Sequence, residues 1–415
     1  MVNKQILPNG VRILTERLDH VRSCAVGIWV ESGSRHEPAE LSGISHFLEH
    51  MLFKGTDTRD AGALAEEFDA IGGQVNAFTT KEHTCYYART LDTHVRRAAE
   101  LLCDMYFRSV FREEDARLER GVILEEIGMY EDTPEDLCGE LLSAAVYPDS
   151  SLGRPILGTR ETLEGIGHRQ LSDYCRRNYA PGNTIVTLCG SFSDDDLRYV
   201  ADQFAAMHAG TPPVLPAAPY TRAAVLRKKD IEQNHLIVAF PCPALGAPER
   251  FTLQALNNIL GAGMSSRLYQ RVREQAGLCY NLYSYTSLYL GAGVLGVYVA
   301  LSRSTERQAL SLIRDELVRF RGQGVTEAEL SRTKEQLKAG LLMGLESTIS
   351  RMSSMARSEM LYGTEVPVEE LVAGLEAVTC ADVRDLAQTV LDFGQMSFSA
   401  VGSVAKEEEY LGIFR

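Results

Sequence analysis

The sequence has few of the features that mark secreted, membrane-spanning or nucleic-acid-binding proteins. Its nine cysteines are scattered and include no C-x-x-C pair, which is typical of reduced thiols and indicates no disulfide framework. No apolar run is long enough to span a bilayer, and residues 1–10 contain no apolar signal core. We therefore expect a cytoplasmic protein with no membrane partner.

Positive charge is also scarce. The chain has 42 Lys and Arg against 56 Asp and Glu, a formal net charge of −14 at pH 7, which argues against nucleic acid as a partner. This balance would suit a cavity that attracts basic or neutral peptides, although a solvated acidic surface explains it equally well. With 45% hydrophobic and 24% charged residues, the composition is that of a soluble globular protein.

A proline-rich segment divides the 415 residues near their middle. Four prolines among small residues make 211–224 a predicted linker between domains at 1–210 and 225–415. Both halves show a strand, a proline-containing loop, a helix, an alternating strand pair, a long amphipathic helix and a strand ending in glycine. We predict an α+β fold of two homologous domains, each a mostly antiparallel sheet with helices on one face. In the first half we expect strands at 24–30, 74–90 and 184–190 and the long helix at 114–130, with counterparts at 235–240, 278–301, 396–402 and 327–345.

The most informative short segment is His46-Phe47-Leu48-Glu49-His50. On a helix, His46 and His50 lie on one face, where two imidazoles can bind one metal ion. Glu49 lies on the adjoining edge, close enough to take a proton from a metal-bound water. This is the arrangement of a zinc hydrolase in the inverted order His-x-x-Glu-His. The alternative is a chance pattern on an amphipathic helix whose apolar side chains fill a core.

A catalytic zinc usually has three protein ligands, and a long helix offers Glu119, Glu125 and Glu126 as candidates for the third. Glu119 and Glu126 are two turns apart and point the same way, whereas Glu125 faces solvent. We expect Glu126 among apolar residues, where an unpaired carboxylate is unfavourable and zinc is a natural partner. Glu119 would orient a ligand histidine. The alternative for both is pairing with Arg117 or Arg120.

The second half has lost the metal chemistry. The residues that align with the two histidines and the glutamate are Gln254, Asn257 and Asn258, and their amides cannot replace two imidazoles and a carboxylate around zinc. Only the first domain is therefore expected to bind metal. The glycine-containing segment 261–266 is too irregular for a phosphate-binding loop and fits a substrate-contacting turn better.

These motifs resemble the pitrilysin or insulinase superfamily of zinc peptidases, and within it the short processing-peptidase branch that includes the mitochondrial processing peptidase β-subunit. The similarity covers nearly the whole chain. The segments that carry it are 7–10, 43–56, 76–84, 119–127, 155–158 and 179–183. The resemblance implies an endopeptidase that acts on peptides or unfolded segments.

The resemblance also implies one zinc ion per chain, held by His46, His50 and Glu126, with Glu49 activating the water. Two other functions stay open. One is a non-catalytic structural or binding subunit, like the inactive core subunits of respiratory complexes that resemble this family. The other is a zinc hydrolase of a non-peptide substrate. The four intact residues argue against the first, because inactive copies would be expected to lose them.

Outside the metal site, the resemblance implies that Asn76, Ala77 and Phe78 bind the peptide as an added strand at a sheet edge. The same segment reads equally well as core sheet. Arg273 and Tyr280 would complete the active site by holding a substrate carbonyl and donating to the oxyanion. The alternative is a surface arginine and a core tyrosine. Long superfamily members close four such domains around a chamber, so we expect two of these chains to form a homodimer with shared active sites.

Overall fold

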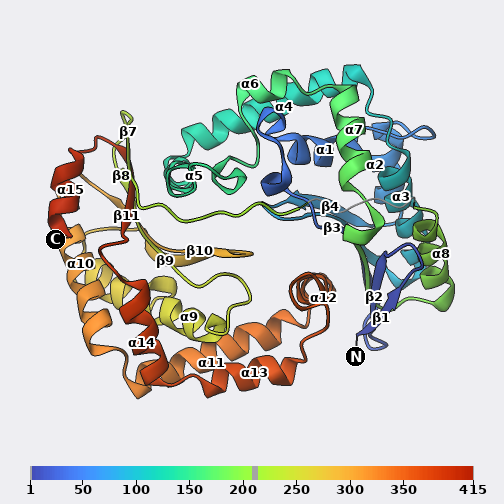
Figure 1. The fold of residues 1–415 in the computed structure, drawn as a ribbon. Coiled ribbons are helices and arrows are strands. Elements are labelled where there is room, and N and C mark those ends of the chain that lie inside the picture. The colour runs from blue at the N-terminus through green and yellow to red at the C-terminus, as the bar shows by residue number, and fades with distance from the viewer. Residues whose placement is uncertain (1, 208–213, 415) are drawn as a thin grey trace. The chain divides into compact units, whose positions relative to one another are not determined.

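The computed structural model describes residues 2–207 and 214–414, which fold into two compact units (Figure 1). Residues 211–213 of the predicted linker lie outside the described part. Each unit combines segments that are far apart in the sequence. Among the described residues, unit 1 comprises 2–128, 154–207, 214–216 and 342–366, and unit 2 comprises 129–153, 217–341 and 367–414.

The two sheets share one topology, as the internal repeat predicts. Unit 1 has six strands in the order β1-β2-β6-β3-β5-β4, and unit 2 has five in the order β7-β11-β8-β10-β9. Apart from β1, the two orders match strand for strand, and each sheet has one parallel pair, β2–β6 or β11–β7. The strands are β1 (Asn3–Ile6), β2 (Arg12–Arg17), β3 (Ser23–Val30), β4 (Gln74–Thr79), β5 (Thr84–Leu91), β6 (Thr184–Gly190), β7 (Ala224–Lys228), β8 (Asn234–Pro241), β9 (Leu282–Tyr289), β10 (Ala292–Leu301) and β11 (Ser397–Gly402).

The predicted central strands and long helices are confirmed to within a few residues, whereas β1, β2 and β7 were not expected. The helices are α1 (Ile44–Leu52), α2 (Ala61–Ala70), α3 (Val95–Arg108), α4 (Glu113–Asp132), α5 (Pro134–Val146), α6 (Arg160–Glu164), α7 (His168–Asn178), α8 (Asp194–Ala205), α9 (Arg250–Asn257), α10 (Glu306–Gln323), α11 (Glu327–Gly344), α12 (Thr348–Tyr362), α13 (Val368–Ala377), α14 (Cys380–Val390) and α15 (Glu407–Ile413). Two π-helical segments cover Asn258–Ala262 and Tyr269–Gln275, and 3₁₀ turns cover Ser34–His36, Ala39–Leu41, Asp92–His94, Ser151–Gly153 and Pro181–Asn183.

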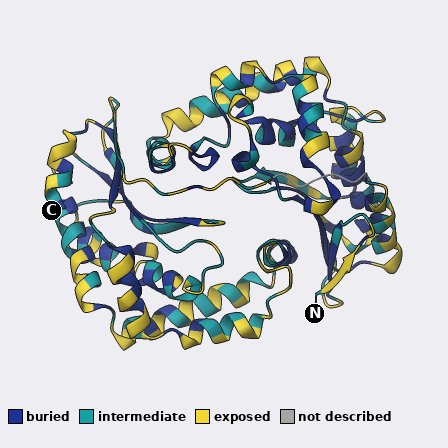
Figure 2. Ribbon diagram, in the orientation of Figure 1, coloured by how far each residue is buried: buried dark blue, intermediate teal, exposed yellow. Residues whose placement is uncertain are grey.

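The main core of unit 1 lies between the sheet and α1, α3 and α7. Phe47, Leu48 and Met51 of α1 are completely buried there against inward-facing residues of β3 and β5. Burying such large apolar side chains contributes about 2 kcal/mol each. Strand β6 is buried along its whole length, so its second face also needs a cover. Peripheral helices such as α8 instead show exposed residues in yellow beside buried ones in dark blue (Figure 2).

That second face is covered by a helix from the other half of the chain. Met352 and Met355 of α12 pack on the face of the unit 1 sheet that carries Trp29. In unit 2 the exchange is reciprocal, because Leu142 of α5 packs beside Ile237 on the second face of that sheet. We predicted helices on only one face of each sheet. In the structure, one helix from the other half of the sequence also covers the second face of each sheet. Among the described residues, no helix combines the length and apolar character needed to cross a membrane.

Candidate metal centre

Helix α1 carries the His-x-x-Glu-His motif and starts at a tightly constrained point. Gly43, before the first turn, has a φ of 96°, and a Cβ there would lie 2.6 Å from the carbonyl oxygen of Leu157. The buried carboxylate of Glu37 accepts hydrogen bonds from the backbone nitrogens of Gly43 at 2.7 Å and Ser45 at 2.8 Å. Burial raises the pKa of Glu37 to about 7. Glu37, which sequence reasoning missed, thus satisfies two free N–H groups of the metal-site helix.

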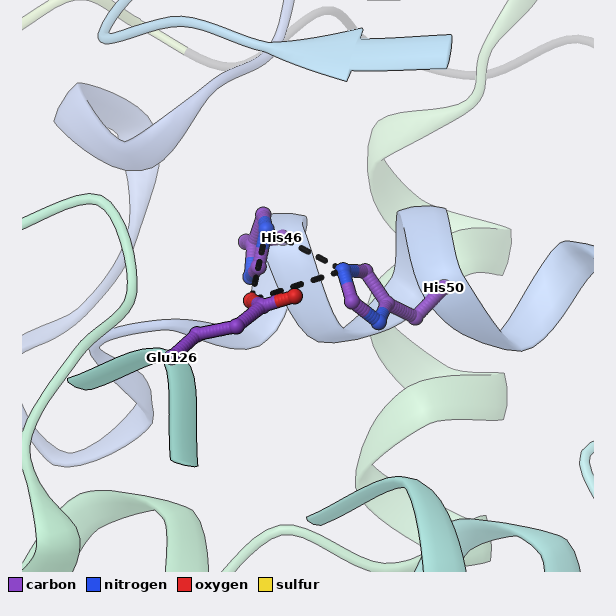
Figure 3. Close-up of side chains that lie close together, drawn as sticks. All are labelled: His46, His50 and Glu126. Atoms are coloured by element: carbon purple, nitrogen blue, oxygen red, sulfur yellow. Dashed lines mark hydrogen bonds and ion pairs between the residues drawn. The ribbon is translucent and has the colours of Figure 1, made fainter. Parts of the chain in front are cut away.

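His46 and His50 point toward each other and toward Glu126 on α4 (Figure 3). Their Nε2 atoms are 3.2 Å apart, and Oε2 of Glu126 lies 3.7 Å from His46 Nε2 and 3.8 Å from His50 Nε2. Three tetrahedral ligands about 2.1 Å from one zinc ion would lie roughly 3.4 Å from one another. The three side chains therefore fit a single zinc ion. Within residues 2–207 and 214–414, they are the one group of three His, Cys, Asp or Glu spaced for a metal.

The protonation of the two histidines is set by different surroundings. Burial, assisted by the neighbouring His50, lowers the pKa of His46 to about 3, so that its imidazole is neutral. Burial also lowers the pKa of His50, but its hydrogen bond to Glu119 and the charge of Glu126 outweigh that effect and raise it. A neutral imidazole is the form that binds a metal.

Glu126 has the expected neighbours but not the expected burial. Its side chain is 33% exposed, and Val122 and Tyr130 on the same helix are exposed too. The prediction of an apolar setting was therefore wrong, although the structure does bring Glu126 to the histidines. Glu125 is exposed, as predicted from the helical spacing.

Glu119 lies behind His50, on the side away from Glu126. Its Oε1 is 2.9 Å from Nδ1 of His50, and its Oε2 is 2.6 Å from Nζ of Lys54. The predicted contact with a motif histidine is thus present. Arg120 instead donates to the carbonyls of residues 163 and 166. Lys54 was missed because no motif rule assigns a role to a lysine one turn after the second histidine.

Glu49 is not one of the three clustered side chains, although it interacts electrostatically with His50 and Glu126. Its Oε2 accepts a hydrogen bond of 2.5 Å from the hydroxyl of Thr79 on β4. Burial raises the pKa of Glu49, and the hydrogen bond from Thr79 opposes that rise. A partly buried carboxylate of raised pKa beside the cluster has the properties expected of a general base.

The predicted substrate strand is the edge strand of unit 1. Within the described chain β4 pairs only with β5, so its other edge is open. Ala77 packs toward the helices and Phe78 toward the opposite face, 5.7 Å from Trp29 in an edge-to-face contact. Asn76 is exposed. This segment is therefore not an interior strand, and its edge can accept a further strand.

Arg273 and Tyr280 lie close together in unit 2, and the ring of Tyr269 also contacts Arg273. The guanidinium carbon of Arg273 is 4.8 Å from the centre of the Tyr280 ring and 4.6 Å from that of Tyr269. Tyr280 is 79% exposed, so it is not the core tyrosine of the alternative interpretation. Both predicted residues belong to unit 2 and the metal cluster to unit 1, and their joint role stays a prediction.

An acidic cavity lies within unit 2. Its volume is about 260 Å³, and four tyrosines and three acidic residues line much of its wall: Tyr130, Tyr283, Tyr285, Tyr298, Glu135, Asp136 and Glu140. Oε2 of Glu140 is buried and has no hydrogen-bond partner among the described residues. Sequence reasoning missed this cavity because the acidic residues come from α5, in the first half of the chain.

Matches to known families cover most of the chain. Residues 12–160 match insulinase (peptidase family M16), and residues 166–337 match the inactive domain of peptidase M16. The chain belongs to peptidase family M16. The division into one insulinase half and one inactive half agrees with the loss of metal-binding side chains from the second repeat of this M16 chain.

Relatives in several bacteria are similar over almost their full length. A protein from Bacillus subtilis named as a zinc protease is 43% identical over 94% of this M16 chain and 95% of its own. A zinc protease homologue from Streptomyces coelicolor is 39% identical over 98% of this chain and 91% of its own length. A third, from Rickettsia felis, is 36% identical over 95% of this chain and 96% of its own length.

Solved structures share the fold at low sequence identity. A protease from Helicobacter pylori superposes with a TM-score of 0.89 at 19% identity, covering 97% of this chain and 99% of that one. A chain of Complex III2 from Candida albicans gives a TM-score of 0.86 at 19% identity, covering 100% of both. At this identity the likeness shows the fold alone.

Proposed function

We propose that this M16 chain is a zinc-dependent endopeptidase that hydrolyses peptides or unfolded segments. The observation that carries the proposal is the cluster of two imidazole nitrogens and one carboxylate oxygen, spaced for one zinc ion, with Glu49 near enough to interact electrostatically with His50 and Glu126. His46, His50 and Glu126 would hold one zinc ion per chain. When bound, zinc would supply a Lewis acid that polarises a peptide carbonyl and acidifies a water molecule.

Residues of the chain itself would transfer the proton and orient the metal ligands. Glu49 takes a proton from the attacking water and passes it to the leaving amine, for which its raised pKa is suited. Glu119 forms a hydrogen bond with Nδ1 of His50, so that Nε2 of the same ring is free to bind the metal. Neither role requires a residue outside unit 1.

The open edge of β4 supports a preference for extended substrates. A peptide that adds to this edge gains main-chain hydrogen bonds whatever its sequence, and it must be unfolded to do so. We expect oligopeptides to be cleaved efficiently and a folded protein containing the same segment to resist cleavage. Equal cleavage rates for both forms would contradict strand addition.

The acidic cavity in unit 2 supports a preference for basic side chains. Tyrosine rings and carboxylates around one cavity suit a lysine or arginine side chain, through cation–π contacts and charge-assisted hydrogen bonds. We expect the double change Asp136→Asn and Glu140→Gln to reduce the kcat/KM preference for a lysine-containing peptide over its methionine analogue about tenfold, which is the worth of roughly 1.4 kcal/mol. Asp149→Asn, at an exposed acidic residue of unit 2, is the matched control and should leave that preference unchanged.

We further propose that two chains form a homodimer in which Arg273 and Tyr280 of one subunit serve the metal site of the other. The support is that the metal cluster lies in unit 1, whereas Arg273 and Tyr280 lie in unit 2, where Tyr280 is exposed and Arg273 is partly exposed. In this arrangement Tyr280 would donate a hydrogen bond to the oxyanion.

Metal dependence is the direct test of the proposed function. The purified protein should contain about one zinc per chain, lose peptidase activity on chelation and regain it when zinc is added. His46→Ala should lose both zinc and activity. His20→Ala, at an exposed histidine of unit 1, should keep both. Equal zinc content in the His46→Ala and His20→Ala proteins would overturn the assignment, and a zinc-loaded protein inactive on all peptides would favour a non-catalytic role or a different substrate.

A further inference from the structure

The general base proposed above is tied to the strand proposed to receive the substrate. Thr79 is the last residue of β4, and its hydroxyl donates to Oε2 of Glu49 on α1 across 2.5 Å. Within the described residues, this is the one hydrogen bond that the Glu49 side chain makes. Oε1 of the same carboxylate is therefore left for another partner, such as a water molecule.

The position of Thr79 follows from the pleat of β4. Side chains alternate between the two faces of a strand, and Val75 and Ala77 already pack toward the helices. Thr79, two residues further, falls on the same face and meets α1. Its backbone is held by pairing with Thr84 of β5, whose own hydroxyl donates to the carbonyl of Ser32. The hydroxyl of Thr79 is thus presented from a fixed point of the sheet.

We propose that Thr79 is a positioning residue that fixes the carboxylate of Glu49 relative to the peptide bound along β4. The inference rests on the proposed function, because it assumes that Glu49 is the base and that β4 receives the substrate. A free glutamate has several rotamers, and a short hydrogen bond to an ionised oxygen selects one of them. The base and the substrate are then both held by β4, so that the base is already oriented when the peptide binds.

Removing the hydroxyl tests this role while keeping the shape of the side chain. Thr79→Val should lower kcat by about 10- to 100-fold and leave KM within about twofold, because a misplaced base affects the reaction more than substrate binding. Thr79→Ser keeps the hydroxyl and should stay within about threefold of the wild-type kcat. Thr90→Val removes a threonine hydroxyl from β5 of the same sheet, at a site bonded only to the carbonyl of Ile71, and should behave as wild type.

A second measurement separates positioning of the base from damage to the strand. The affinity of metal-free protein for a peptide and the zinc content of the purified protein should both be unchanged by Thr79→Val. Weaker peptide binding with an unchanged kcat would overturn the inference, because it would place the role of Thr79 in the strand. If Thr79→Val does not fold, Thr79→Ala removes the same hydroxyl with less bulk and carries the same expectations.

Failure of this inference can be told apart from failure of the proposed function. If Glu49→Gln is inactive and both Thr79→Val and Thr79→Ala turn over peptide at the wild-type rate, only the positioning role is wrong. If Glu49→Gln cleaves peptides at the wild-type rate, the proposed base is wrong and the positioning role is overturned with it. A loss of kcat in both variants, with recovery in Thr79→Ser, supports the inference.

Discussion

Glu119 and His50 are joined by a contact of 2.9 Å between Oε1 and Nδ1, and Lys54 approaches the second oxygen of the same carboxylate at 2.6 Å. Burial raises the pKa of Glu119, but hydrogen bonds with His50 and Lys54 outweigh that effect and lower it. The ionised carboxylate favours a proton on Nδ1 of His50. The lone pair of Nε2 then faces His46 and Glu126, which is the orientation that metal binding needs.

This contact predicts that Glu119→Gln will weaken zinc binding by about 10- to 100-fold, the usual effect of removing a group that orients a ligand histidine. Competition with a chelator of known affinity measures the change. Glu125→Gln, on the same helix but exposed, is the matched control and should bind zinc as wild type does. Wild-type zinc affinity in Glu119→Gln would show that the contact does not orient the ligand.

Because Glu49 is not part of the cluster that could hold the metal, we predict that a substitution can remove the base and leave metal binding intact. Glu49→Gln should retain a full complement of zinc and its peptide affinity, yet lose turnover by roughly 10²- to 10⁴-fold, because an amide cannot accept the proton of the attacking water. Metal analysis and single-turnover kinetics on the same sample measure both. The exposed Glu66→Gln controls for loss of a carboxylate in unit 1. Turnover near the wild-type rate in Glu49→Gln would refute this mechanism.

The proposed sharing of active sites predicts complementation between two inactive proteins. Glu49→Gln lacks the base and Tyr280→Phe lacks the hydroxyl that would donate to the oxyanion, so each homodimer should be inactive or strongly impaired. A mixed dimer would contain one intact site, and up to about half of the wild-type specific activity should return in it. Subunit exchange is checked by co-purification of differently tagged chains. If the chains exchange and no activity returns, the pair does not act across subunits.

The burial of Glu37 predicts a pH dependence of stability that is independent of metal. Its folded-state pKa, about 7, lies above the ordinary value of 4.5, so the folded state binds more protons than the unfolded state between these values. The contribution is fully present below pH 4.5 and is lost as pH rises through about 7. It amounts to at most about 3 kcal/mol in the free energy of unfolding.

Urea unfolding of metal-free protein between pH 5 and 8 measures this effect as the difference between wild type and Glu37→Gln. The variant should be less stable at pH 5, because its amide cannot accept both helix hydrogen bonds without burying unpaired N–H groups. It should also lose less stability than wild type as the pH rises. Parallel pH profiles for the two proteins would show that Glu37 does not titrate in this range.

Short-range patterns in the sequence were enough to predict the repeat, the central strands and the candidate ligands on two helices, whereas the resemblance to the zinc peptidases implied that these ligands share one metal ion. His46 and His50 share a face because the helix repeats every 3.6 residues, and Glu119 and Glu126 share a face for the same reason. The loss of metal-binding side chains at Gln254, Asn257 and Asn258 was also visible, since it is a matter of residue type alone. Each of these inferences needs only local geometry or chemistry.

Features that depend on which distant segments pack together were decided by the tertiary structure. The contact of Thr79 with Glu49, the approach of Lys54 to Glu119 and the capping of α1 by Glu37 join residues from different elements. The exposure of Glu126 likewise depends on what covers α4, and its helical spacing predicted the wrong environment.

The exchange of α5 and α12 between the two halves of the sequence shows the physical reason most plainly. Periodicity in α12 specifies that one face of this helix is apolar, but not which sheet will bury it. Met352 could have packed on the sheet of its own half, yet it lies against the sheet that contains Trp29. The hydrophobic effect is non-directional, so the sequence by itself determined that this face is buried, and only the packed structure decided where.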